Sequence, residues 1–279
     1  MATAPNKPTT PVKKESSTAS GMFAVLTIPI CIIIGVLIFI FILGNPSHYA
    51  GGDVEHGIPQ DIFGTVHKGG PIVPVIMSFV LMVIVFSIER AIVIGKASGT
   101  GNMDAFVRKI TSQLNAGNID AANAECDKQK GSVANVIKSG LKKYREMEAD
   151  DTLTIDQKTL AIQKDIEEAT SLEMPMLEQN LTIIATLVSI GTLSGLLGTV
   201  VGMIGAFQTL SASGAPDTSE LSANISEALI NTALGITTSA SSIILYNFFT
   251  SKIDKLTYAI DETGFSIVQT FAASHAARK

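Results

Sequence analysis

The sequence predicts an all-α integral membrane protein with four transmembrane helices and with long helices that extend into the cytoplasm. Two observations predict this fold class. Charged residues make up only 16% of the 279 residues, against roughly 25% in an ordinary soluble protein. The chain also contains four stretches without a charged side chain, at residues 21–52, 69–88, 179–216 and 228–251. Because a helix needs about 20 apolar residues to cross a bilayer, each stretch is long enough to span one.

The first 70 residues divide into a tail, a helix and a loop. Residues 1–21 are rich in Pro, Thr, Ser and Lys and have no apolar periodicity, so we expect a disordered cytoplasmic tail. Residues 22–43 form a continuous apolar run. The apolar core of a signal peptide is only about 7–15 residues long, so this longer run predicts an uncleaved transmembrane helix, with a cleaved signal as the alternative. Residues 44–70 follow as a loop.

The rest of the chain is predicted to alternate between membrane helices and polar segments. Residues 71–94 form the second transmembrane helix, and residues 95–179 form a polar region whose apolar residues recur at helical spacing. These amphipathic faces either close the core of a solvated helical domain or pair between subunits. The remaining segments are a transmembrane helix at residues 180–210, a loop at 211–222, a transmembrane helix at 223–250 and a C-terminal helix at 251–279.

The distribution of Lys and Arg predicts the orientation in the membrane. Three of them precede the first apolar run, one lies in the loop after it, twelve lie between Arg90 and Gln179, none lies at residues 211–222, and four lie in the C-terminal segment. Segments on the cytoplasmic side carry the excess of Lys and Arg. We therefore expect both termini and the large middle region in the cytoplasm, and the two short loops on the other side of the membrane, which is the periplasm if the membrane is a bacterial inner membrane.

Five glycines recur along the third transmembrane helix at spacings of three or four residues. At about 100° per residue, such a series shares one narrow face of the helix. Small residues allow backbones to approach closely in lipid, where apolar burial does not drive helices together. The stripe therefore predicts tight helix packing, either against the fourth transmembrane helix or between subunits. The glycines are Gly191, Gly195, Gly198, Gly202 and Gly205.

The third and fourth transmembrane helices each carry a strip of polar side chains among apolar ones. Such groups are costly when they face lipid, so they indicate either hydrogen bonds to the backbone of their own helix or a partner or hydrated path. On the second interpretation the residues that line a pore are Thr192 and Thr199 of the third helix and Asn231, Thr232, Thr238, Ser239 and Ser242 of the fourth.

Glu227 is the only acidic residue between Glu220 and Asp254. It is either an interfacial carboxylate, stabilised by the positive end of a helix dipole, or a partly buried acid at one end of a proton path. Hydroxyl groups can order water but do not titrate near neutral pH. If a proton crosses the membrane here, an acid in the middle of the membrane must therefore come from another chain.

Composition and motifs argue against several other classes of protein. The net charge is −5, there is no tryptophan, and no basic cluster contains aromatic residues, so we expect no nucleic-acid binding. Two cysteines, Cys31 and Cys126, suggest neither a disulfide framework nor a zinc site. Known nucleotide-binding, zinc-protease and serine-hydrolase motifs do not occur. Three of the four histidines lie near one another in the sequence (His48, His56 and His67), but surface histidines are expected rather than a metal site. We expect no cofactor and no enzyme activity.

Three motifs resemble the MotA/TolQ/ExbB proton channel family, with ExbB the closest type. They are GLLGTVVGM at residues 195–203, EALINTALG at residues 227–235, and Tyr246-Asn247. The pair Gly69-Gly70 before the second transmembrane helix and the sequence SIER at its end, residues 87–90, fit the same family. The resemblance extends over about residues 65–265 of this chain.

The resemblance implies a subunit of a proton-channel motor in the bacterial inner membrane. ExbB-type subunits form a pentamer around a central pore, and ExbD-like helices in that pore carry the membrane aspartate that takes up protons. Proton flow is thought to drive rotation that energises a TonB-like protein and thereby import across the outer membrane. On this resemblance, Thr199 and Thr232 match the two pore threonines, and Glu227 matches the glutamate of the family.

The chain also departs from the family pattern. Thr192 and Ser241 stand where many members have proline, so the two pore helices are expected to be straighter here. The first apolar run, residues 22–43, is additional to the usual three transmembrane helices. Two other functions stay open at this point. One is a TolQ-like role in envelope integrity, and the other is a membrane scaffold that binds partners without conducting protons.

Overall fold

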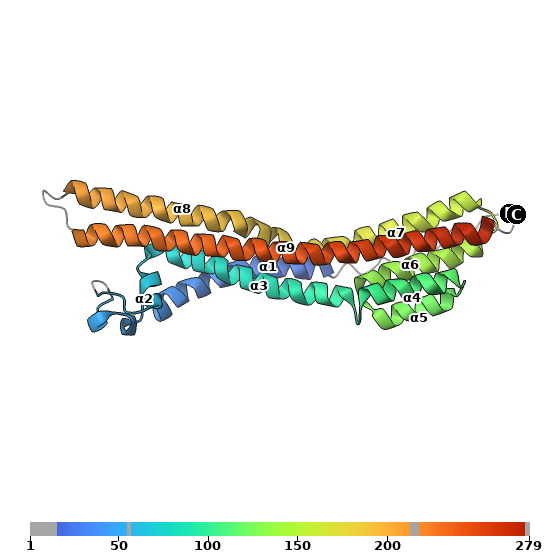
Figure 1. Ribbon diagram of the computed structural model, residues 1–279, viewed down its shortest axis with the longest axis horizontal. Coiled ribbons are helices and arrows are strands. Elements are labelled where there is room, and N and C mark those ends of the chain that lie inside the picture. The colour runs from blue at the N-terminus through green and yellow to red at the C-terminus, as the bar shows by residue number, and fades with distance from the viewer. Residues whose placement is uncertain (1–15, 55–56, 213–217, 277–279) are drawn as a thin grey trace, which may run out of the picture.

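The computed structural model describes residues 16–54, 57–212 and 218–276. The described residues form an elongated bundle of helices, and their only β-type pairing is a single bridge between Tyr49 and Pro59. Four of the helices are long and apolar enough to cross a membrane. The predicted all-α membrane fold is therefore confirmed. As Figure 1 shows, the long helices lie along one axis, and a cluster of shorter helices occupies one end.

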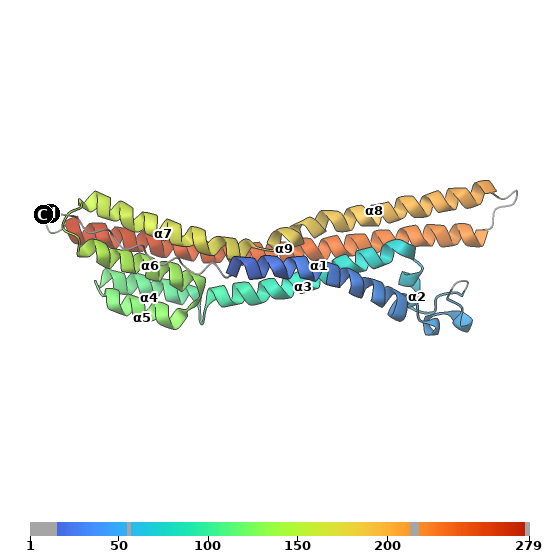
Figure 2. The same cartoon turned by 180° about the vertical axis from the view of Figure 1, so that it is seen from behind.

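The N-terminal part contains the first two apolar helices and the loop between them. Helix α1 begins at Ser16, inside the segment that was expected to be a disordered tail, and residues 1–15 of that segment lie outside the described residues. Seen from behind in Figure 2, α1 runs along α3. The elements in chain order are α1 (Ser16–Leu37), the π-helix η1 (Ile38–Leu43), the short helices η2 (Pro46–His48), η3 (Ala50–Gly52), α2 (Ile62–His67) and η4 (Gly70–Ile72), and α3 (Val73–Ser98).

The polar middle region folds into four helices, of which α4, α6 and α7 pack against the last part of α9. They are α4 (Met103–Asn115), α5 (Ile119–Gln129), α6 (Gly131–Glu148) and α7 (Ile155–Glu178). Together with residues 253–271 of α9 we call them the helical domain. Apolar side chains from α4, α6, α7 and α9 meet in its core, where Ile110, Ile137, Ile162 and Ile260 are buried. The amphipathic faces of the middle region are therefore paired within the chain.

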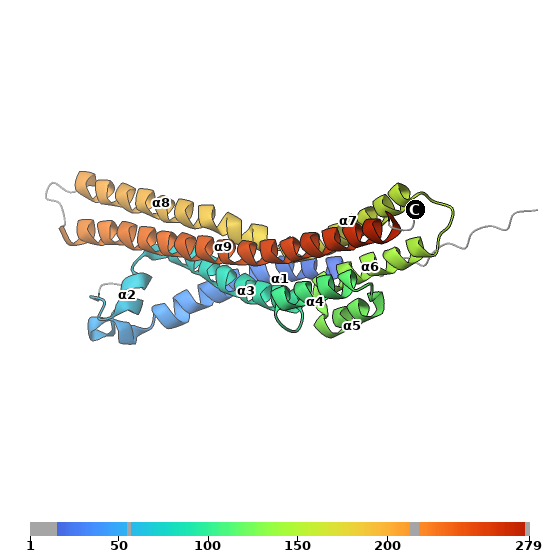
Figure 3. The same cartoon turned by 45° about the vertical axis from the view of Figure 1, so that its right-hand side comes forward.

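The last two helices form an antiparallel pair that passes through the membrane-spanning half of the molecule. Helix α8 (Leu181–Ala212) lies beside the first half of α9 (Thr218–Ala276). Figure 3 shows α9 running on without a break from this pair into the helical domain. At 1.5 Å per residue its 59 residues extend about 88 Å. The sequence suggested two helices here, divided at residue 250, but one continuous helix joins the two regions. We call α8 together with residues 218–250 of α9 the hairpin.

A break separates α7 from α8, at the boundary between the helical domain and the hairpin. Asn180 has a φ of 61°, which a residue with a side chain rarely adopts and which turns the chain out of the helix. Arg90 of α3 is fully buried here, and its Nη1 donates to the carbonyl oxygens of Met176 at 3.2 Å and Leu177 at 3.0 Å. The last carbonyl groups of a helix lack partners within it, so Arg90 caps α7. Glu89 pairs with the same guanidinium.

Candidate functional site

The five glycines of α8 place its backbone directly against α9. A Cβ atom on Gly195 would lie 3.0 Å from the carbonyl oxygen of Asn231 and 3.1 Å from Cα of Gly235. A Cβ atom on Gly202 would lie 2.8 Å from Cβ of Ala228. Atoms this close leave no room for a side chain. The glycine stripe thus packs within the chain, which was one of the two alternatives left open by the sequence. Gly191, Gly198 and Gly205 also face α9.

Two pairs of hydroxyl groups meet across the seam between α8 and α9. Thr199 Oγ1 is hydrogen-bonded to Thr232 Oγ1, and Thr192 Oγ1 donates to Ser239 Oγ at 2.7 Å. Ser239 Oγ in turn donates to the carbonyl oxygen of Val188 at 2.6 Å. Thr199 and Thr232 are half-buried and Thr192 is exposed. We call these the seam pairs. Thr192, Thr199 and Thr232 are accessible to water or to another helix, whereas Ser239 is buried.

The other predicted pore residues occupy a different face of α9. Asn231, Thr238 and Ser242 are at most 1% exposed. Thr238 and Ser242 donate to the carbonyl oxygens of Leu234 and Thr238, in each case at 2.8 Å. The sequence placed these three residues on an open pore surface. The structure instead buries them within the chain, where Asn231 lies between Gly198 of α8 and Gly69, and Thr238 lies against Gly191 of α8.

Glu227 lies on the same covered face, near the start of α9, where it is half-buried. Its carboxylate lies against Gly70, in the turn before α3: a Cβ atom on Gly70 would lie 2.7 Å from Cδ of Glu227. One turn further along α9, Asn231 Nδ2 donates to the carbonyl oxygen of Gly69 at 2.7 Å. The sequence did not identify Gly69 or Gly70 as part of the site, since a Gly-Gly pair before an apolar run signals only the start of a helix.

The histidines of the N-terminal loop are held by protein partners. His48 Nδ1 lies 2.6 Å from Oδ2 of Asp61, and the backbone N–H of Gly64, together with this contact, lowers the pKa of the Asp61 carboxyl. Tyr49 Oη lies 2.7 Å from Nδ1 of His67. His56 lies outside the described residues. These contacts indicate that His48 and His67 stabilise the fold of the loop.

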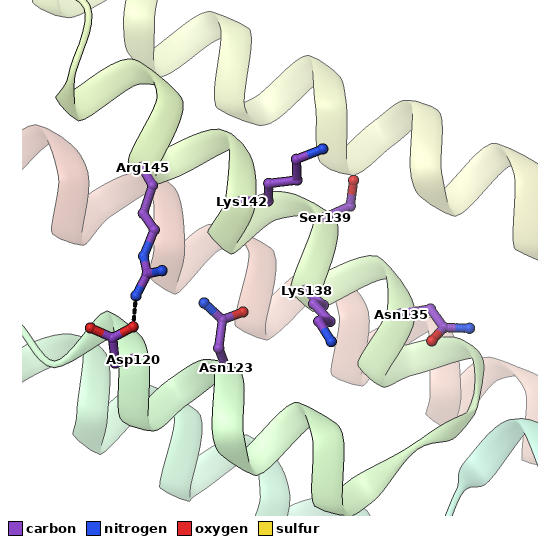
Figure 4. Close-up of a pocket in the computed structure, with 7 residues that line it drawn as sticks. All are labelled: Asp120, Asn123, Asn135, Lys138, Ser139, Lys142 and Arg145. Atoms are coloured by element: carbon purple, nitrogen blue, oxygen red, sulfur yellow. Dashed lines mark hydrogen bonds and ion pairs between the residues drawn. The ribbon is translucent and has the colours of Figure 1, made fainter. Parts of the chain in front are cut away.

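A polar groove of about 540 Å³ lies between α5 and α6, in the helical domain. Figure 4 shows its lining residues, with Arg145 ion-paired to Asp120. The other basic groups are paired as well: Lys138 with Asp127 at 2.5 Å, and Lys142 with Glu146 at 3.9 Å. Because its charges are already compensated, this groove offers no strong reason to expect an ionic ligand. The candidate site is therefore the hairpin.

The hairpin is also where the chain matches known proteins. The model of the MotA/TolQ/ExbB proton channel family matches residues 128–262, a stretch that contains all of α8 and most of α9. Over this stretch, which is 135 of the 279 residues, the chain is similar to that family. Both glycine-rich α8 and the segment of α9 that carries Glu227 and Thr232 fall inside the match, together with α6 and α7 of the helical domain.

Three relatives illustrate how the chain stands within the MotA/TolQ/ExbB family. It is 33% identical to the biopolymer transport protein ExbB-like 3 of Synechocystis over 31% of this chain and 42% of that protein. It is 40% identical to ExbB of Aquifex aeolicus over 28% of this chain and 52% of that protein. With TolQ of Pseudomonas aeruginosa it shares 26% identity over 55% of this chain and 67% of that protein. The chain thus covers less than half of the Synechocystis relative.

Proposed function

We propose that this chain is an ExbB-like subunit of a proton-channel motor in the bacterial inner membrane, which uses the proton motive force to energise TonB-dependent transport across the outer membrane. The observation that supports this most directly is the pair of hydroxyls of Thr199 and Thr232 at the open seam of the hairpin. Polar groups inside a membrane usually mark a functional site. Two hydroxyl groups that meet across neighbouring helices can order water along a path.

The hairpin itself has no acid in the middle of the membrane. The sequence carries no charged residue at 179–216 or at 228–251, so on this proposal the titrating group comes from an ExbD-like partner helix that supplies an aspartate. A helix can approach the seam closely because Thr199 and Thr232 are only half-buried. Five copies of the chain would surround the partner, as the family implies, with exposed apolar side chains such as Leu196 and Val200 available for contacts with lipid or between copies.

The hydroxyl pair can be tested by replacing both threonines with valine, which keeps the shape of the side chain. We expect Thr199→Val/Thr232→Val to lower proton-driven uptake across the outer membrane at least about tenfold, because water in the seam would lose its polar partners. Thr237→Val is the matched control, since Thr237 is exposed on the same helix and bonds the carbonyl oxygen of Ala233. Unchanged uptake in the double variant would favour a scaffold that does not conduct protons.

The orientation in the membrane has a separate test. On this proposal both termini are cytoplasmic, so a reporter fused after Lys279 should be active in the cytoplasm. A reporter inserted at Gly214, in a stretch outside the described residues, should be active in the periplasm. The opposite pattern would contradict the proposed path of protons through the hairpin.

A TolQ-like role is the second candidate, and one observation favours it. The similarity to TolQ of Pseudomonas aeruginosa extends over 155 residues, further than the 88 and 77 residues matched in the two ExbB-type relatives. A deletion strain separates the candidates. Loss of uptake of a bulky iron chelate would support the ExbB-like role, whereas sensitivity to detergent with normal uptake would support the TolQ-like role. Copurification would identify the ExbD-like and TonB-like partners directly.

A further inference from the structure

We infer that the Gly69–Gly70 turn before α3, held in register by Asn231, positions the carboxylate of Glu227. This inference rests on the proposed function only in giving Glu227 a place in the proton path. The contact joins segments about 160 residues apart in sequence, and so brings the loop that follows α1 to the half of α9 that lies in the hairpin. Gly70 and Asn231 would be positioning residues, because they act on the proton path through Glu227.

The backbone of the turn lies directly against the carboxylate of Glu227, with no room for a side chain at Gly70. Gly70 has a φ of 73°, a conformation that favours glycine. A Cβ atom at this position would collide with Oε1 of Glu227 and would lie 2.7 Å from Cδ. Any residue other than glycine would therefore displace the carboxylate or the turn. The neighbouring Gly69 is also close to α9, since a Cβ atom there would lie 2.8 Å from Cγ2 of Ile230.

Asn231 fixes the position of the Gly69–Gly70 turn along the axis of α9. It lies one helical turn beyond Glu227, is fully buried, and donates from Nδ2 to the carbonyl oxygen of Gly69 at 2.7 Å. On its other side it fills the space left by Gly198 of α8, where a Cβ atom would lie 2.7 Å from Cγ of Asn231. Asn231 is thus wedged between α8 and the turn, and a buried amide held in this way cannot move without losing its hydrogen bond.

Among the residues that the structure describes, the titratable groups nearest the turn in sequence are His67 and Lys68. Lys68 lies two residues before Gly70, and its Nζ donates to the carbonyl oxygen of Val54 at 3.1 Å. On α9, Glu220 lies about two turns before Glu227 and Asp254 lies far along the helix. On α8 the sequence has no charged residue. The environment of the Glu227 carboxyl is therefore set mainly by how closely the Gly69–Gly70 turn and the hairpin surround it, which is a matter of packing.

The test is the titration of Glu227 in the purified full-length chain in lipid nanodiscs. The carboxyl band is followed by infrared spectroscopy across pH, and the spectrum of Glu227→Gln is subtracted to isolate it. We expect Gly70→Ala to move the midpoint by about one pH unit, since displacement changes both hydration and hydrogen bonding of the group. Gly51→Ala is the matched control. Gly51 has a φ of 74° but no atom within 4 Å of the added Cβ, so it reproduces the backbone strain without the collision.

A double-mutant cycle separates collision from general damage. Aspartate is one methylene shorter than glutamate, so in a Glu227→Asp background the added methyl group of Gly70→Ala should move the midpoint by less than about 0.3 units. A second variant, Asn231→Ala, should move the Glu227 midpoint by about half a unit through the lost bond to Gly69. Its control is Asn247→Ala, on an exposed position of the same helix. Asn231→Ala also serves if Gly70→Ala does not fold.

Two results would overturn the inference. One is a midpoint in Gly70→Ala that moves no further than in Gly51→Ala. The other is a shift from Gly70→Ala that is equally large with Glu227 intact and in the Glu227→Asp background, combined with no shift in Asn231→Ala. None of these measurements requires a partner subunit or proton flow. The positioning of Glu227 can therefore hold even if the valine variants of the seam leave uptake unchanged, and it can fail while the proposed proton channel stands.

Discussion

The hairpin and the helical domain share helix α9, yet they are packed by opposite means. In the hairpin, α8 meets α9 where side chains are missing, with Gly195 close to the backbone of Asn231 and Gly235. In the helical domain the same helix is held by large apolar side chains, such as Ile260 and Phe271, that are buried against α4, α6 and α7. Lipid surrounds the first half on the proposed topology and water the second, so apolar burial can drive association only in the second.

This difference decides where each region can carry function. Because α8 packs against α9 through its glycines, its larger side chains, such as Leu193 and Leu196, point away from α9 and are exposed. The hydroxyl groups of the seam pairs lie between the two helices. The helical domain buries its apolar stripe and presents ion pairs outward, such as Lys128 with Glu125. The hairpin is therefore suited to contacts with lipid and other helices, and the helical domain to remaining folded in water.

The largest expected effect is on the glycine contact. Gly195→Val should prevent α8 from reaching α9, since the added atoms meet backbone that cannot move aside. We expect a loss of about 3 kcal/mol or more, at the upper end for overpacked sites, seen as a lower thermal unfolding temperature in detergent. Gly95→Val is the control: Gly95 is also helical, but a Cβ atom there has no neighbour within 4 Å. Equal effects of the two variants would contradict tight glycine packing.

A smaller effect is expected from removing apolar volume, and only in the helical domain. Ile137 is fully buried in the domain core, so Ile137→Ala should cost about 2–4 kcal/mol through lost burial and the cavity left behind. Leu196 of α8 is 57% exposed, and Leu196→Ala should change the stability of the separated chain by less than about 1 kcal/mol. Thermal unfolding of both variants measures the contrast. A large loss for Leu196→Ala would show that copies of the chain already bury it.

The smallest effect concerns the reactivity of the Cys126 thiol, which reports whether solvent reaches the core of the helical domain. Burial raises the pKa of Cys126 to about 12. The thiol is therefore neutral at pH 8, and alkylation there should be at least about tenfold slower than in the unfolded chain. The pKa of Cys126 is higher in the folded chain than in the unfolded chain, where it is near 9. Burial of the neutral thiol therefore contributes fully to the stability of the fold below about pH 9, and this contribution is lost between about pH 9 and 12. Mass spectrometry of alkylated peptides measures the rate, and rapid labelling at pH 8 would mean an open core.

The sequence was sufficient for the fold class and the family, because both depend on local patterns. Charge-free runs of the required length located the four apolar helices, and periodicity predicted helices within residues 95–179, where the structure has α4 to α7. It divided the last segment at residue 250 into two helices, where the structure has one continuous helix. Composition changes there from apolar to polar, but the hydrogen bonds of a helix do not depend on the polarity of its side chains, so α9 continues.

The division of the polar strip could not be predicted, for a geometric reason. Helical spacing gives the angle of each side chain on its own helix but not which neighbour lies at that angle. Glu227 and Asn231 face the turn before α3, whereas Thr232 points along the seam to Thr199. The contact between Gly70 and Glu227 depends on this packing as well, and no local pattern in the sequence contains it.

The unbroken helix α9 and the break at Asn180 together have a mechanical consequence. Two connections lead from the hairpin to the helical domain. One is the continuous helix α9, and the other is the break at Asn180 between α8 and α7, where Arg90 holds the end of α7. Because a continuous helix resists bending and twisting, a small tilt of α9 in the bilayer would swing its far end, at Ala276, through a much larger arc. The break at Asn180 lets α7 follow. On the proposed function, torque generated among the hairpins would therefore be delivered to the far end of α9 as displacement.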